Sequence, residues 1–148
     1  DEDEIIYLER TSNGHSLVRV VYLIGGRAPL HLTSLGKLFL ATDRIESVRA
    51  YAKRTGLPGK TPYSLTRLDA LENELEKVRR EDLAYDNEEA ELGLRCLAAP
   101  IRNDEGVIVA GLSISAPTDR HSAGWVDPLK NATDVISRAL GYRSSVLK

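Results

Sequence analysis

The alternation of apolar and polar residues is clearest in the second half of the chain. Two apolar runs, residues 94–101 and 107–115, flank a polar break that ends in Gly106. Two such runs joined by a short glycine-containing turn are typical of a β-hairpin. In the second run, a period of two collects the larger apolar side chains on one face: Ile108, Ala110, Leu112 and Ile114.

The other face of this predicted hairpin carries small and polar side chains. Ser113 and Ser115 share this face in the second run, and in the first run Leu94, Cys96 and Ala98 share a face. A face of small polar groups is either half solvated or the lining of a concave site for a small polar ligand. The alternation alone leaves both interpretations open.

The first part of the chain predicts two more strands. Residues 5–10 read as a strand that ends in a turn at 12–14, and residues 17–24 form a second, β-branched run closed by Gly25 and Gly26. The two runs could pair as a hairpin.

Four helices are predicted from helical periodicity and capping signals. The third is the clearest, because leucine and valine recur at helical spacing there. A capping box of Asp43 and Glu46 is expected to open the second, and Asp127 and Pro128 are expected to open the last, with Gly141 as its C-cap. The helices are expected near residues 33–41, 43–56, 66–80 and 127–140. Strands followed by helices, then strands and a helix, predict an α+β fold with a mainly antiparallel sheet.

The first predicted helix is opened by small residues, with Thr33 or Ser34 as its N-cap. Free backbone N–H groups at such a helix start are a natural seat for an anion. The alternative is an ordinary buried helix in which Gly36 permits close packing.

Composition narrows the class of protein. The 148 residues suffice for one domain with a real core, and 42% hydrophobic with 28% charged residues is a globular balance. The net charge of −2 and the lack of a basic block argue against a nucleic-acid-binding surface on this chain.

A single cysteine excludes an internal disulfide and a cysteine-based zinc site, so a reducing, cytoplasmic compartment is expected. No apolar run could span a membrane. The absence of methionine indicates a piece of a longer protein.

The signals for catalysis are weak. Cys96 would need a base such as His31 or His121 to act as a nucleophile, and a lone cysteine in an alternating strand is usually a small buried hydrophobe. No phosphate-binding glycine loop, HExxH or GxSxG motif occurs. The histidines lack metal-ligand spacing, and the acidic run 88–91 is typical of a solvated turn. We therefore predict no catalytic residue and no metal site.

Several blocks together resemble the IclR family of bacterial transcription regulators. Residues 27–41, RAPLHLTSLGKLFLA, are similar to the family signature RxPLHxTxxGKxxLA. Residues 85–89, YDNEE, followed by 93–101, GLRCLAAPI, and 112–117, LSISAP, continue the resemblance in the family's order and spacing. At Ala116 the family more often has glycine.

The resemblance implies a GAF-like fold, in which a curved, mainly antiparallel β-sheet is flanked by α-helices. Residues 1–148 would be the effector-binding domain, and the family's N-terminal winged helix-turn-helix would be absent from this chain. It further implies a cytoplasmic bacterial protein that forms dimers or tetramers, senses a small organic acid without any cofactor, and contacts DNA only through the missing N-terminal domain. Membrane binding is not expected.

The resemblance also places the ligand on the concave side of the sheet, where residues 34–36 close the pocket. Backbone N–H groups there would face a carboxylate, and the two serines would hydrogen-bond the ligand. The residues carried over are Leu17, Val20, Ala28, Ser34, Leu35, Gly36, Asp86, Leu94, Cys96, Ser113 and Ser115. An ionised Asp86 would repel an anion, so we expect it to bind a ligand hydroxyl or the backbone, or to have a raised pKa.

Two other functions remain open from the sequence. The domain could be an oligomerisation module with a vestigial pocket, which an occluded pocket and a hydrophobic surface patch would favour. It could also be an enzyme that uses Cys96, which requires a base within hydrogen-bond reach. Glyoxylate-sized, aromatic and sugar-derived acids all suit the resemblance.

Overall fold

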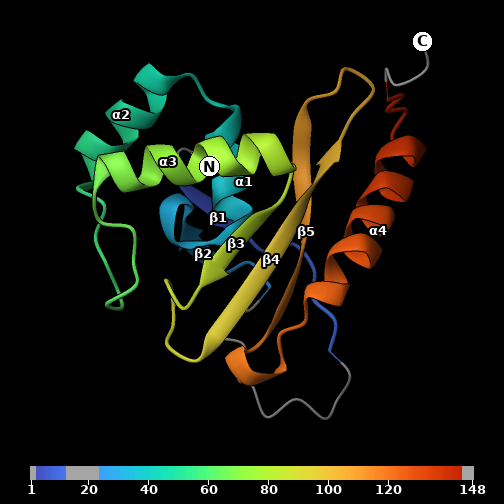
Figure 1. The fold of residues 1–148 in the computed structure, drawn as a ribbon. Helices are drawn as coiled ribbons and strands as arrows, with labels where there is room; N and C mark the ends of the chain where they lie inside the picture. The colour runs from blue at the N-terminus through green and yellow to red at the C-terminus, as the bar shows by residue number, and fades with distance from the viewer. Residues whose placement is uncertain (1–2, 13–23, 145–148) are drawn as a thin grey trace.

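The computed structural model describes residues 3–12 and 24–144, and within them the strands form two antiparallel sheets. Figure 1 shows a larger sheet in the middle of the molecule and a small two-stranded sheet behind it. The small sheet pairs β1 (Glu4–Ile6) with β2 (Arg27–Pro29). The larger sheet has the order β3-β4-β5, formed by Ala84–Asn87, Leu94–Arg102 and Ile108–Pro117. This α+β architecture agrees with the sequence prediction.

The central hairpin is confirmed. β4 and β5 pair antiparallel from Leu94 opposite Pro117 to Arg102 opposite Ile108, with a bulge between Ile101 and Arg102. Gly106 has a φ of 79° in the connecting turn, a conformation that favours glycine. Asn103 closes the turn, because its side-chain oxygen accepts hydrogen bonds from the backbone N–H groups of Glu105 and Val107.

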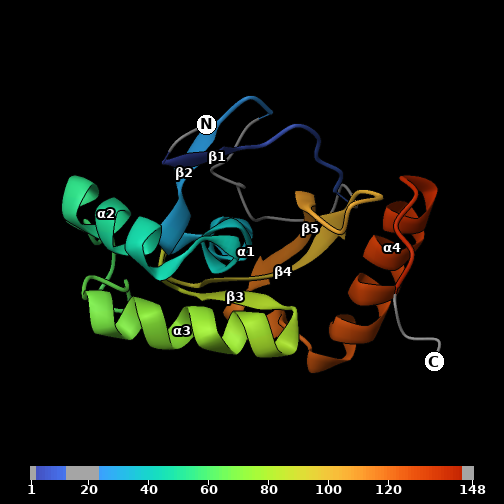
Figure 2. The same ribbon diagram turned by 90° about the horizontal axis from the view of Figure 1, so that it is seen from above.

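Helices cover both faces of the larger sheet (Figures 1 and 2). The helices α1 (Ser34–Thr42), α2 (Ile45–Thr55) and α3 (Leu68–Glu81) lie on one side, and α4 (Val126–Ala139) lies on the other. On the α4 side, Leu97, Ala99 and Leu129 are buried together. On the α1 side, Leu94, Cys96 and Ala98 are buried as well. The β4 part of that face is therefore not solvated, whereas Ser115 on the same face of β5 is exposed.

Two glycines allow α1 to approach its neighbours. A β-carbon on Gly36 would overlap the carbonyl oxygen and Cα of Leu30, in the 3₁₀ turn η1 (Leu30–Leu32), and lie 2.6 Å from Thr33 Oγ1. A β-carbon on Gly111 of β5 would lie 2.7 Å from a methyl group of Leu35. The interpretation of Gly36 as a packing residue is thus what the structure shows.

β1 ends at Ile6, so it is shorter than the strand predicted over residues 5–10, and it pairs with β2. The predicted pairing with residues 17–24 stays a prediction, because 17–23 lie outside the described residues. Two other local predictions were wrong. Asp43 and Glu46 form no capping box, because the helix begins later and Arg44 occupies the cap without a side-chain hydrogen bond. Asp127 lies inside α4, whose N-cap position is held by Trp125 after the 3₁₀ turn η3 (Ala123–Trp125). Because η3 leads directly into α4, the helix starts at Val126, before the predicted N-cap Asp127.

In the part of the chain that the structure describes, no helix is long and apolar enough to cross a membrane.

Candidate functional site

A large cavity opens between β5, α1 and the segment that contains β1. Its volume is about 1300 Å³, which is large enough for a small organic ligand. β5 contributes residues 109–117 to its wall, and Arg120 of the 3₁₀ turn η2 (Thr118–Arg120) lies in the same wall. The described residues that form its wall include Ile5, Tyr7, Arg10, Leu30, Leu35, Phe39, Gly111, Ser113, Ser115, Arg120 and Trp125.

The sheet register places a row of predicted site residues on the face toward α1. Asp86 of β3 lies opposite Cys96 of β4, which lies opposite Ser115 of β5. Ser113 lies two residues before Ser115 and opposite Ala98. Because directly opposed residues share a face of an antiparallel sheet, these side chains belong to one surface. The Ser115 hydroxyl is exposed toward the cavity and donates a hydrogen bond of 3.1 Å to Cys96 Sγ.

Asp86 is held by the protein itself. Its Oδ1 accepts hydrogen bonds from the backbone N–H groups of Glu89 at 2.8 Å and Ala90 at 3.3 Å. Burial raises the pKa of the Asp86 carboxyl above its usual value. The sequence analysis expected Asp86 to bind the backbone or to have a raised pKa if the ligand is an anion. The structure shows both features.

The start of α1 offers fewer free donors than the sequence suggested. Thr33 is the N-cap, and its Oγ1 accepts the backbone N–H of Gly36 at 3.1 Å. That N–H group is therefore committed to the cap. Leu35 lines the cavity, whereas Ser34 and Gly36 are buried behind it.

The predicted site residues thus divide into groups. Leu35, Ser113 and Ser115 line the cavity. Cys96 and Asp86 lie on the same sheet face as the serines, and Leu94 precedes them on that face of β4. Leu17 and Val20 lie outside the described residues. Ala28 is fully buried in the β1–β2 pair opposite Ile5 and is not part of the described wall.

Sequence reasoning missed several residues of the wall. Phe39 follows Leu35 by one helical turn on α1, a spacing that puts both on one face. Arg120 and Trp125 come from the segment after β5, and Arg10 comes from the segment after β1. Only the i, i+4 spacing of Leu35 and Phe39 was available as a signal, because the other contacts depend on the chain path.

In the described part of the chain, Cys96 Sγ accepts a hydrogen bond from Ser115, and neither His31 nor His121 bonds to it. Burial raises the pKa of the Cys96 thiol to about 12, which makes it a poor nucleophile. His31 is fully buried, with its ring nitrogens 2.7 Å from Tyr51 Oη and 3.0 Å from the Pro58 carbonyl oxygen. His121 contacts Trp125 edge-on, with ring centroids 5.4 Å apart and an interplanar angle of 64°. Within residues 3–12 and 24–144, no cluster of three or more acidic, histidine or cysteine side chains could hold a metal ion.

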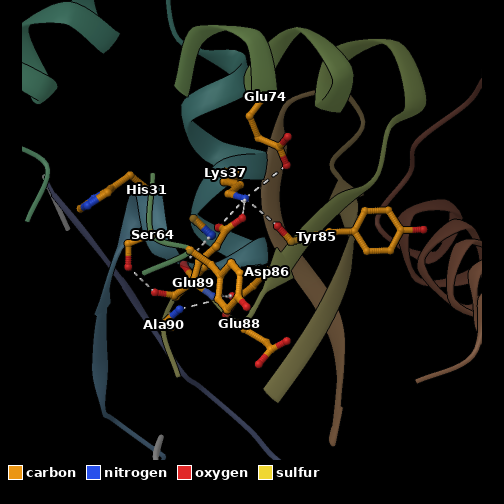
Figure 3. A network of polar contacts seen from close by, with 12 residues as sticks. His31, Lys37, Ser64, Glu74, Tyr85, Asp86, Glu88, Glu89 and Ala90 are labelled. Atoms are coloured by element: carbon orange, nitrogen blue, oxygen red, sulfur yellow. Dashed lines mark hydrogen bonds and ion pairs between the residues drawn. The ribbon is translucent and has the colours of Figure 1, made fainter. Parts of the chain in front are cut away.

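A buried ionic cluster lies behind the site, and Figure 3 shows Lys37 at its centre. The Lys37 side chain is fully buried, and its ammonium donates to Glu74 Oε1 at 3.2 Å, the Tyr85 carbonyl oxygen at 2.7 Å and Glu89 Oε1 at 2.9 Å. Glu89 Oε2 lies 2.7 Å from the same nitrogen. Burial raises the pKa of Glu89 to about 7 although Lys37 opposes this shift.

Comparison with known proteins identifies the family to which this fold belongs. The profile described as "Bacterial transcriptional regulator IclR C-terminal" matches residues 1–139. The chain belongs to this family. Its relatives in sequence are HTH-type transcriptional regulators, not enzymes.

Among the relatives, the HTH-type transcriptional regulator KdgR of Escherichia coli (strain K12) is 38% identical over 146 residues, which cover 96% of this chain and 55% of KdgR. The KdgR of Dickeya chrysanthemi is also 38% identical. The chain spans about half the length of these curated relatives.

Solved structures agree with the fold. The C-terminal domain of E. coli KdgR superposes with a TM-score of 0.81 at 36% identity, covering 96% of this chain and 84% of that one. An IclR homolog from Microbacterium hydrocarbonoxydans, crystallised with 4-hydroxybenzoate, gives 0.86 at 29% identity, covering 95% of this chain and 57% of that one.

Proposed function

We propose that this chain is the effector-sensing domain of a transcription regulator, and that a small organic acid binds in the cavity beside β5. The full-length protein would respond because the acid prefers one of its conformations. DNA contact would belong to a helix-turn-helix domain outside this chain, and the compartment would be the bacterial cytoplasm. These roles rest on family membership and on the cavity.

The observation that carries the proposal is the position of Ser113 and Ser115 in the cavity wall. Their hydroxyls lie on one face of β5 and are surrounded by apolar groups such as Leu35 and Phe39. A mostly apolar cavity with a few convergent polar groups is typical of a small-molecule site. The same wall carries Arg10 and Arg120 together with the acidic Glu4, Glu9 and Asp43, so an anionic ligand would have to bind beside the arginines.

A thermal-shift screen with carboxylic acids tests the proposal. The panel contains glyoxylate, 4-hydroxybenzoate and gluconate, each paired with a neutral analogue of similar size. An acid at about 100 times its Kd should stabilise the fold by about 2.7 kcal/mol, a rise in Tm of about 5–11 °C for a domain of this size. The neutral analogue should have a much smaller effect. Equal shifts for acids and neutral analogues would contradict a carboxylate site.

We also propose that the domain associates with itself as a dimer. The apolar side chains of Val135, Ile136 and Leu140 near the end of α4 are 67%, 38% and 49% exposed. Among the described residues the cavity is open, which argues against the alternative of a purely oligomeric module with an occluded pocket. Light scattering at increasing concentration should show a mass above 16.3 kDa, whereas a strict monomer at high concentration would contradict association.

A further inference from the structure

Two of the sequence blocks that mark the family meet at the buried Lys37 ammonium. The block at 27–41 supplies Lys37 itself, on α1, and the block at 85–89 supplies the Tyr85 carbonyl oxygen and the Glu89 carboxylate. Glu74 of α3 completes the set. Three separate parts of the chain are thus joined by one side chain with no exposed surface. A buried charge of this kind persists only when it is fully paired.

The cluster is connected to the proposed effector site at both ends. On α1, Leu35 comes two residues before Lys37 and lines the cavity, where it packs against Gly111 of β5. At the other end, the Glu89 backbone N–H donates to Asp86, which lies in the row that leads through Cys96 to Ser115. The ammonium therefore ties the helix that covers the site to the strand and turn that bound it.

We propose that Lys37 is the positioning residue of the effector site. Its three anchors on α3, β3 and the turn after β3 fix α1, and thereby set the place of Leu35 relative to Ser113 and Ser115. This inference rests on the proposed function. Lys37 does not touch the cavity, since it is absent from the described wall and is fully buried.

The charges around Glu89 give the cluster a pH dependence that purely apolar packing would lack. The groups facing it are Lys37 from α1, Asp86 from β3 and Glu74 from α3. His31 lies near Lys37, but burial lowers its pKa, so it stays neutral above the usual value of 6.5. As pH rises through about 7, Glu89 loses its proton and the cluster becomes more negative. The ion pair between Lys37 and Glu89 is then complete and holds α1 more firmly, so the effector should bind more tightly, by about threefold.

The first experiment compares Lys37→Met with Lys77→Met. Lys77 is a matched control, because it is an exposed lysine 3.8 Å from the same Glu74 but has no link to α1. The probe is whichever of glyoxylate, 4-hydroxybenzoate and gluconate binds the wild type. Lys37→Met should weaken binding about tenfold or more by calorimetry, and Lys77→Met should leave it unchanged. Equal affinity in a folded Lys37→Met protein, or equal losses in both variants, would overturn the proposal.

Glu89→Gln tests the cluster through the dependence of effector affinity on pH, which a loss of stability alone would not change. It keeps a hydrogen-bonding group but removes the titration, so the dependence of affinity on pH between about 6 and 8 should disappear. A Glu89→Gln protein with the wild-type pH profile would contradict the role of the cluster. If Lys37→Met does not fold, the double variant Lys37→Met/Glu89→Gln removes both partners and leaves fewer unpaired buried charges.

A second measurement needs no effector and separates this inference from the proposed function. Cys96 is the chain's single cysteine and lies buried on the face that α1 covers. Its alkylation by a maleimide under native conditions should speed up about tenfold in the Lys37 variant, because α1 opens more often. The Lys77 variant should react at the wild-type rate. Unchanged reactivity would show that Lys37 does not hold α1, whether or not any acid binds.

Discussion

Gly36→Ala is expected to destabilise the protein by about 3 kcal/mol or more. Inside a helix this substitution normally stabilises by about 0.5–1 kcal/mol, so the sign itself is diagnostic. The reason is steric. The added β-carbon would overlap backbone atoms of Leu30, which cannot rotate away, and would lie 2.6 Å from the Thr33 hydroxyl that caps α1. Urea denaturation should show the loss, and Tm should fall by about 6–12 °C.

Gly124→Ala is the matched control for this prediction. Gly124 is exposed, and a β-carbon there would meet nothing closer than the Ser122 hydroxyl at 3.4 Å. Its stability should change by no more than about 0.5 kcal/mol. A Gly36→Ala protein as stable as the wild type would show that η1 and α1 can separate at little cost.

Replacing both Ser113 and Ser115 with alanine is expected to weaken binding of the acid found by screening on the order of a hundredfold or more. Each hydroxyl would donate to a charged group, and such a hydrogen bond contributes about 1.5–3 kcal/mol. The fold should persist, because Ser113 is only half-buried and Ser115 is exposed, and the partner of Ser115 is a cysteine sulfur. Calorimetry of the double variant gives the measurement.

The control for the serine pair is Ser47→Ala, an exposed serine on α2 outside the described cavity wall. Its affinity should equal that of the wild type. Unchanged affinity in a folded Ser113/Ser115 double variant would move the ligand site off β5. In that case the two hydroxyls would be solvent-facing groups of β5 with no role in binding.

Much of the fold could be predicted because its signals are local. The hairpin of β4 and β5 follows from period-two alternation around Gly106, and α3 follows from leucines at helical spacing. Boundaries and caps were less predictable. Trp125 rather than Asp127 holds the cap position of α4, because the preceding 3₁₀ turn leads directly into the helix. Such a turn has no strong sequence signal of its own.

The candidate site shows the same division. Alternation put Ser113 with Ser115, and Cys96 with Leu94, on shared faces, and the register that aligns Asp86, Cys96 and Ser115 across three strands came from the tertiary structure. Arg120 and Trp125 reach the cavity only because the chain turns back after β5.

By itself the sequence determined the α+β class, the helices and the central hairpin, since these depend on neighbours a few residues apart. Only the tertiary structure decided that Lys37, in an apolar helix, is buried among Glu74, Tyr85 and Glu89. It also decided that Gly36 serves packing. Both depend on contacts between segments whose separation in sequence carries no periodic signal, because desolvation and steric exclusion act through space.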